Sequence, residues 1–427
     1  MNNMYLRLIL SIVLAIFLVQ SSVSFANTEV KTSPLIVPDN DVYLLTPELH
    51  RLLKRYRAGE QFDPLPELKA ELARMPHLPS THLLVAGRYL VNVLIDNEEK
   101  RYDAITRHHF NACLERAERA KKLKKLRHAG LYYEGLCAGG LAVMDGMRAN
   151  YIDARVEIGR SLDAFFQLNK ERPGHHGALL VVGSYNYFTG RLGSLGKLLL
   201  SILMLPEGNR ELGLQQLYKA SENGTPFDVM GKMMLAPALA NFEDKPDEAI
   251  ALVEEAAHKL VPENPGVHLS LAFYYLMEGR LKEASKSLAT SDKYQIKDAL
   301  KSGVFEIRSN KIYTMLVKAV LLCIKKQDDN SLALLYQFTH PRKKIPSGVA
   351  PGAMMVVGHL FKLAGLDEKA NEMYGRVRDF EKAPRMMRDE ATRFMEEKNI
   401  SDRMKLPLEI KDKLRSWLQD RPLPKTL

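Results

Sequence analysis

The stretch that decides the fold is residues 246–284, PDEAIALVEEAAHKLVPENPGVHLSLAFYYLMEGRLKEA, which holds the starts of two similar helical segments 35 positions apart. Each segment places a small residue, an apolar residue four positions later and a second small residue three positions after that. These positions are Ala249, Val253 and Ala256 in the first copy and Ala284, Leu288 and Ser291 in the second. Residues at this spacing share one helix face, and small side chains there let a second helix approach closely. The stretch therefore predicts helices packed in pairs.

The partner of the second copy is predicted between the two segments. Pro265 marks its start, Leu271, Ala272 and Tyr275 form its apolar face, and Gly279 marks the turn that follows. Related copies are predicted before and after this stretch, and a degenerate one is centred on Ala333. Their marker residues are Gly213, Leu217 and Ala220 in the earlier copy and Gly358, Phe361, Gly365, Ala370, Tyr374 and Val377 in the later one. A period near 35 residues is typical of stacked helical hairpins.

Residues 183–188, GSYNYF, the leucines at 198–200 and residues 205–214, LPEGNRELGL, carry a resemblance to a known family. They resemble a branch of bacterial tetratricopeptide proteins and the eukaryotic tetratricopeptide repeat 39 group, although Asn209 stands where that group favours Asp. The resemblance covers about residues 178–284 and implies helical repeats without a catalytic residue. The expected fold is thus all-α: a tetratricopeptide-like helical-hairpin solenoid, coiled as a right-handed superhelix.

The first 26 residues are typical of a secretory signal peptide. Arg7 is their only charge, residues 8–19 are nearly all apolar, and Ser24-Phe25-Ala26 has small residues at the positions that specify cleavage. Cleavage after Ala26 predicts a periplasmic or secreted protein, either free or associated with a membrane. The alternative is an uncleaved anchor, for which the apolar run is short.

The mature chain is expected to begin with a flexible leader, residues 27–44. N-terminal helical hairpins then occupy 45–175, tetratricopeptide-like repeats 176–400, and a C-terminal cap and tail 401–427. Helices are predicted at 47–57, 65–75, 81–96, 101–127, 131–147 and 151–169. Residues 178–182 have the composition of a strand but lie where a helix is due. Residues 342–346 are predicted to form a basic loop.

The three cysteines, Cys113, Cys137 and Cys323, are interpreted as buried small apolar residues. A turn predicted near His128-Ala129-Gly130 would place Cys113 and Cys137 at different heights on antiparallel helices. The offset of about 10 Å that follows from the helical rise would be too large for a disulfide.

The formal net charge is +10, which favours acidic partners such as an anionic membrane surface, a cell-wall polymer or an acidic protein. The densest basic patch has two interpretations: a solvated helix end whose cations complement the helix dipole, or a surface for a membrane or polymer. Nucleic acid is not expected as a partner, because no aromatic residue interleaves these lysines. The patch consists of Lys121, Lys122, Lys124, Lys125 and Arg127.

No catalytic residue, metal site or cofactor is predicted. Residues 190–197, GRLGSLGK, lack the spacing of a phosphate-binding loop, and Leu198 lacks the hydroxyl that would bind magnesium. The pairs His108-His109 and His175-His176 point apart on a helix, so neither pair chelates one metal. They are interpreted as surface or capping histidines.

Three polar residues in an apolar helix, Tyr185, Asn186 and Tyr187, require hydrogen-bond partners. They either lock adjacent repeats together or, with Tyr274 and Tyr275, line a concave groove for a peptide.

The sequence leads to three functional hypotheses. The first is a non-enzymatic exported scaffold that binds an envelope protein or peptide on its concave face. The second is a periplasmic protein that binds or delivers a solute or lipid in association with a transport system. The third, an envelope hydrolase, lacks any recognisable constellation.

Overall fold

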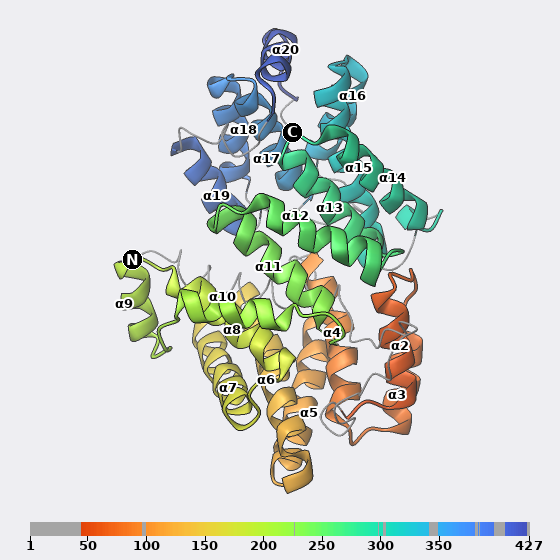
Figure 1. Cartoon of the computed structure of the whole chain (residues 1–427), viewed down its shortest axis with the longest axis vertical. Helices are drawn as coiled ribbons and strands as arrows, with labels where there is room; N and C mark the ends of the chain where they lie inside the picture. Colours follow the sequence, from red (N-terminus) through yellow and green to blue (C-terminus); the bar gives the residue numbers. More distant parts are fainter. Residues whose placement is uncertain are drawn as a thin grey trace. The chain divides into compact units, whose positions relative to one another are not determined.

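The computed structural model describes residues 44–95, 100–225, 227–297, 299–301, 305–340, 349–380, 383, 385–396 and 406–424. Every regular element in these ranges is a helix, which confirms the all-α prediction (Figure 1). The predicted signal peptide, all of the leader except Leu44, and the basic loop at 342–346 lie outside the described residues.

The chain divides into two compact units between Glu263 and Asn264, with residues 95–98 grouped with the second. Each unit is built from helices packed on their neighbours along the chain. Unit 1 holds α2 (Pro47–Arg57), α3 (Leu65–Arg74), α4 (Pro79–Ile95), α5 (Asp103–Lys121), α6 (Arg127–Met147), α7 (Tyr151–Glu171), α8 (His176–Gly190), α9 (Ser194–Ile202), α10 (Arg210–Ala220), α11 (Asp228–Phe242) and α12 (Pro246–Glu255). Unit 2 holds α13 (Pro265–Met277), α14 (Leu281–Tyr294), α15 (Phe305–Lys326), α16 (Asp329–Tyr336), α17 (Val349–Leu363), α18 (Asp367–Asp379), α19 (Arg385–Glu396) and α20 (Leu408–Leu418).

The small and apolar positions that predicted the hairpins are buried. Ala249, Val253 and Ala256 are inaccessible, and so are Leu217 and Ala220 at the equivalent places of the earlier copy. The degenerate copy has a different register, because Ala333 is exposed while Leu332 and Leu335 are buried. Residues 178–182 belong to α8, as predicted against their strand-like composition.

Small residues bring α8 and α10 into close contact. A Cβ atom at Gly213 would lie 2.2 Å from the backbone nitrogen of Tyr187, and one at Gly183 would lie 2.9 Å from Cβ of Gln216. Only glycine permits such an approach between helix backbones. Gly190 has the same use, since a Cβ there would lie 2.3 Å from the nitrogen of Arg210. Only residues 191–193 of the glycine-rich segment form a turn between helices, because Gly190 ends α8 and residues 194–197 begin α9.

Five hairpins share one backbone feature that the sequence shows only in part. In each, a left-handed residue stands two positions before the second helix begins. Glycine occupies this place twice, and three other residue types occupy it elsewhere. The five residues are Ala149, Asp244, Gly279, Gln327 and Gly365. After Ala149, Gly279 and Gly365, the next residue donates its N–H to the carbonyl five positions earlier, which is the Schellman way of ending a helix.

The turn between α5 and α6 corrects two predictions. Helix α5 ends at Lys121, a 3₁₀ turn covers Lys124–Leu126, and α6 begins at Arg127. Gly130 lies inside α6 and marks no turn. Its role is close packing, because a Cβ there would lie 2.5 Å from the backbone nitrogen of Lys121.

This earlier turn makes a disulfide possible between the two helices. Cys113 lies nine residues before Lys122 and Cys137 eleven residues after Leu126, so the two cysteines stand at nearly the same height. They form a disulfide with their Cα atoms 6.3 Å apart, and the interpretation of both as free residues was wrong. Cys323 is free and buried, as interpreted, and burial raises the pKa of its thiol to about 12.

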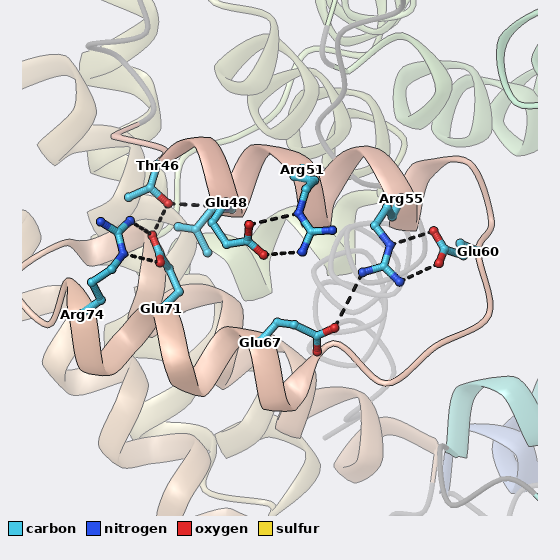
Figure 2. Close-up of polar contacts among 9 residues, drawn as sticks. Thr46, Glu48, Arg51, Arg55, Glu60, Glu67, Glu71 and Arg74 are labelled. Atoms are coloured by element: carbon cyan, nitrogen blue, oxygen red, sulfur yellow. Dashed lines mark hydrogen bonds and ion pairs between the residues drawn. The ribbon is translucent and has the colours of Figure 1, made fainter.

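Polar contacts join the two helices of the first hairpin, α2 and α3. Figure 2 shows Glu71 of α3 accepting hydrogen bonds from Thr46, which caps α2, and from Arg74. At the other end, Arg55 of α2 binds Glu60 at 2.6 Å and lies 3.7 Å from Glu67. Hydrogen bonding to Arg74 is the main cause that lowers the pKa of Glu71.

A buried ion pair ties this first hairpin to a helix far along the chain. Arg57, the last residue of α2, donates to Oδ1 of Asp228 at the start of α11 over 2.7 Å. The two side chains are 3% and 0% exposed and lie 171 residues apart in sequence. The first helix of unit 1, α2, is therefore in contact with the second-to-last helix, α11.

The C-terminal segment is fastened within unit 2, as expected of a cap. Nζ of Lys369 in α18 donates to the carbonyls of Leu418, Gln419 and Arg421. Tyr336 donates to the carbonyl of Pro422 at 3.0 Å. Leu414 and Leu418 bury the inner face of α20.

We predict that reducing the Cys113–Cys137 disulfide lowers the free energy of unfolding by about 3 kcal/mol, because the bond closes a loop of 24 residues in the unfolded chain. Urea unfolding with and without reductant measures the difference. A Cys113→Ala/Cys137→Ala variant should show no effect of reductant, while Cys323→Ala should respond like the wild type. Equal midpoints for the wild type in both conditions would contradict the pairing.

Candidate functional site

The three polar residues predicted in α8 lie in the interior of unit 1. Tyr185 donates to the carbonyl of Pro206, and Nδ2 of Asn186 donates to Oε1 of Gln216 at 2.9 Å. Tyr187 is inaccessible and donates to Oε1 of Glu243 at 2.6 Å. Burial raises the pKa of both tyrosines. These hydrogen bonds join α8 to the segments that follow it, which supports the locking interpretation of the three residues.

The inner helices of unit 1 are covered on all sides. In α6 every residue from Ala129 to Asp145 is buried. The ring of Tyr132 packs edge-on against Phe165 and Phe227, with ring centres 6.2 and 6.3 Å apart. The three residues of α8 that were predicted for the groove are buried as well: Tyr185, Asn186 and Tyr187 are 3%, 6% and 0% exposed.

The other two residues predicted for the groove lie on α13 in unit 2. Tyr275 is buried, with the guanidinium of Arg280 4.5 Å from its ring centre. Tyr274 is half-buried beside the exposed ring of Phe273, 6.3 Å between ring centres. Tyr274 and Phe273 form a small accessible aromatic surface, and a groove there remains a prediction.

The predicted basic patch forms the turn between α5 and α6, and its members have different environments. Lys121 pairs with Glu134, and Arg127 pairs with Glu171 at 2.8 Å. Lys122, Lys124 and Lys125 are exposed. The structure thus divides the patch into two structural cations and three that face solvent.

A buried histidine pair, which the sequence did not reveal, joins α4 to α5. Nδ1 of His82 lies 3.2 Å from Nδ1 of His109, and Nε2 of His82 lies 3.1 Å from the carbonyl of Pro76. Because a carbonyl only accepts, Nε2 of His82 carries the proton in the neutral pair. Nδ1 of His82 is then the acceptor, and His109 donates to it from Nδ1. Both rings must be neutral, or only His109 charged, for this bond to exist.

The environment of the pair opposes a positive charge. Burial, followed by the field of Arg116, lowers the pKa of His82 to about 4, and burial lowers the pKa of His109. His109 neither lies on the surface nor caps a helix, so its interpretation was wrong. His108 is exposed, and Nδ1 of His175 caps α8 by accepting from the N–H of Ala178. His175 is itself buried, and burial lowers its pKa to about 3. Among the described residues, no group of three or more His, Cys, Asp or Glu is placed to hold a metal.

Exposed apolar side chains, missed in the sequence and named here the apolar patch, lie on α7 and on α9 with the residues that follow it, two elements whose buried faces share one hydrophobic core. Its side chains are between 52% and 81% exposed. Arg155 of α7 donates to the carbonyl of Leu203 at 2.9 Å and so joins the two segments. Met204 lies in the left-handed region, with φ of 51°. The patch consists of Ile152, Val156, Leu198, Ile202 and Met204. The one available signal was the excess of apolar residues in 198–205, more than the single buried face of α9 requires.

A comparison of the sequence with protein-family models and with curated proteins finds no match. Within the described residues, none of the helices has the length and apolar character needed to cross a membrane.

We predict that unit 1 loses stability as the pH falls from 6.5 towards 4. The unfolded chain binds a proton at His82 in this range and the folded chain does not. The free energy of unfolding therefore becomes smaller as the pH falls. Urea unfolding at a series of pH values measures the slope. His82→Gln keeps a donor for Pro76 and should reduce the slope by the share of one histidine, with the remainder due to other histidines whose pKa values are also lowered, His109 and His175 among them. His108→Gln, at an exposed histidine, should leave the slope nearly unchanged. An unchanged slope in His82→Gln would count against the assignment.

Proposed function

We propose that this chain is a non-enzymatic, exported scaffold of tetratricopeptide-like hairpins that binds another envelope protein. The repeated Schellman turns and the buried small residues support the tetratricopeptide-like repeat. The right-handed stacking is part of the same proposal.

Export is supported by the disulfide as well as by residues 1–26. Disulfides form and persist in oxidising compartments and are rare in reducing ones. The pair Cys113–Cys137 is buried, and so it is a structural bond. Oxidation of this pair fits a periplasmic or secreted protein.

The observation that carries the binding proposal is the apolar patch on α7 and α9. Five large, exposed apolar side chains on two neighbouring elements are unusual on a protein without a partner. Exposed charges of both signs lie in or directly after the same segments: Asp153, Glu211 and Arg210, and Glu207, which pairs with Lys197 at 3.2 Å. An apolar centre with a charged edge is typical of a protein interface. The occupant we propose is a protein with an apolar surface and charged residues of both signs at its edge.

We predict that a photoreactive amino acid at Ile202 crosslinks the chain to one envelope protein, and that the same probe at Leu408 does not. Leu408 is exposed and apolar but lies on α20, outside the patch. Adding Ile152→Ser and Val156→Ser should lower the adduct yield at least tenfold, because each lost apolar contact weakens an interface core.

Circular dichroism of the serine variant checks that it remains folded. A protein adduct of equal yield at both probe positions, or one unaffected by the serines, would contradict the proposal. Recovery of a small molecule alone would favour the solute- or lipid-binding function.

A further inference from the structure

The turn between α5 and α6 offers a second surface, of different chemistry from the apolar patch. Leu123 is 56% exposed at its centre, and Lys122, Lys124 and Lys125 surround it in sequence. We name these four residues the basic tip. Figure 1 shows α5 and α6 side by side in unit 1, with the tip at the end of this pair.

The acidic groups near the tip are engaged by other cations. Glu134 binds Lys121 and Arg160, Glu118 binds Arg160, and Glu115 binds Arg119. Glu171 binds Arg127 and lies 3.6 Å from His128. These pairs leave the charge of the three tip lysines uncompensated.

The tip is held in place by several independent contacts. The N–H of Leu123 donates to the carbonyl of Ala120 at 3.0 Å, and the N–H of Leu126 donates to the carbonyl of Leu123 at 2.9 Å. Gly130 brings the backbones of α5 and α6 together directly behind the turn. The disulfide further down the hairpin closes the loop that contains the tip. Binding would therefore require little ordering of this segment.

From this arrangement we infer that the basic tip docks on an anionic phospholipid bilayer, with Leu123 entering the interface and the three lysines meeting the headgroups. Lysine side chains suit this position, because their aliphatic stems lie along apolar surface while the ammonium groups stay at the level of the headgroups. Near an anionic leaflet, each lysine strengthens binding about fivefold. A soluble polyanion would engage the lysines but would gain nothing from Leu123, which is why a bilayer fits the tip better.

This contact is independent of the protein-binding proposal, since the tip and the apolar patch share no residue. The edge of the apolar patch carries charges of both signs, whereas the described carboxylates near the tip are each paired with another cation, so that the exposed charge of the tip is basic. The two surfaces therefore select different partners.

The test is co-sedimentation of the full chain with vesicles of seven parts phosphatidylcholine and three parts phosphatidylglycerol. Pure phosphatidylcholine vesicles give the baseline from other apolar segments. We expect binding above this baseline at about 0.1 M salt and its loss at about 1 M salt. Lys124→Gln/Lys125→Gln should weaken it about 25-fold, and Leu123→Ser about tenfold.

Lys282→Gln/Lys286→Gln is the matched control, because it changes the net charge equally at two exposed lysines of α14. If the control weakens binding as much as the tip variant does, or if both vesicle types bind equally, the inference is wrong. It is also wrong if Leu123→Ser binds normally while the tip lysines are needed, since the tip would then recognise a polyanion without entering a bilayer. Thermal unfolding of each variant shows whether it is folded.

Discussion

The buried ion pair between Arg57 and Asp228 is the constraint on which the form of unit 1 depends. A guanidinium and a carboxylate that are almost inaccessible to solvent lose most of their hydration. Their mutual contact helps to compensate for it, together with the N–H groups of Val229 and Gly224, which donate to Asp228. Burial raises the pKa of Asp228 in spite of Arg57, which shows how strongly the site opposes an isolated charge. The pair joins the end of α2 to the start of α11. The inner helices α6 and α8 are buried by the helices packed on them, α5, α7 and α10. A function that needs accessible surface must therefore use the outside of the unit.

Two outer surfaces meet that need, and their chemistry differs. The apolar patch on α7 and α9 has charges of both signs at its edge, whereas the basic tip of α5 and α6 places one exposed leucine among three exposed lysines. A chain with both surfaces would hold a partner protein near a membrane. The disulfide supports the rigidity of the tip and also agrees with an oxidising location.

Much of the fold was predictable because it depends on local patterns. Pro47 and Pro265 mark helix starts, and the small residues around Ala249 mark a packing face; all are where the sequence placed them. The turn before α6 was misplaced because Gly130 is used for packing and not for a turn. The pairs Arg57–Asp228 and His82–His109 escaped prediction, since contacts between distant segments leave no periodic signal. The apolar patch was missed because the sequence alone does not show whether a leucine is exposed or buried.

A double-mutant cycle between Arg57 and Asp228 tests the closure of unit 1 most directly. The variants are Arg57→Met, Asp228→Leu and the combination, with urea unfolding as the measurement. Each single change should cost about 3 to 5 kcal/mol, because it leaves one charge buried alone, and the double change should cost far less than their sum. A coupling of at least about 2 kcal/mol is the result that the closed arrangement predicts. Additive effects would show that α2 and α11 are not in contact. The inner face of unit 1 would then again be a candidate binding groove.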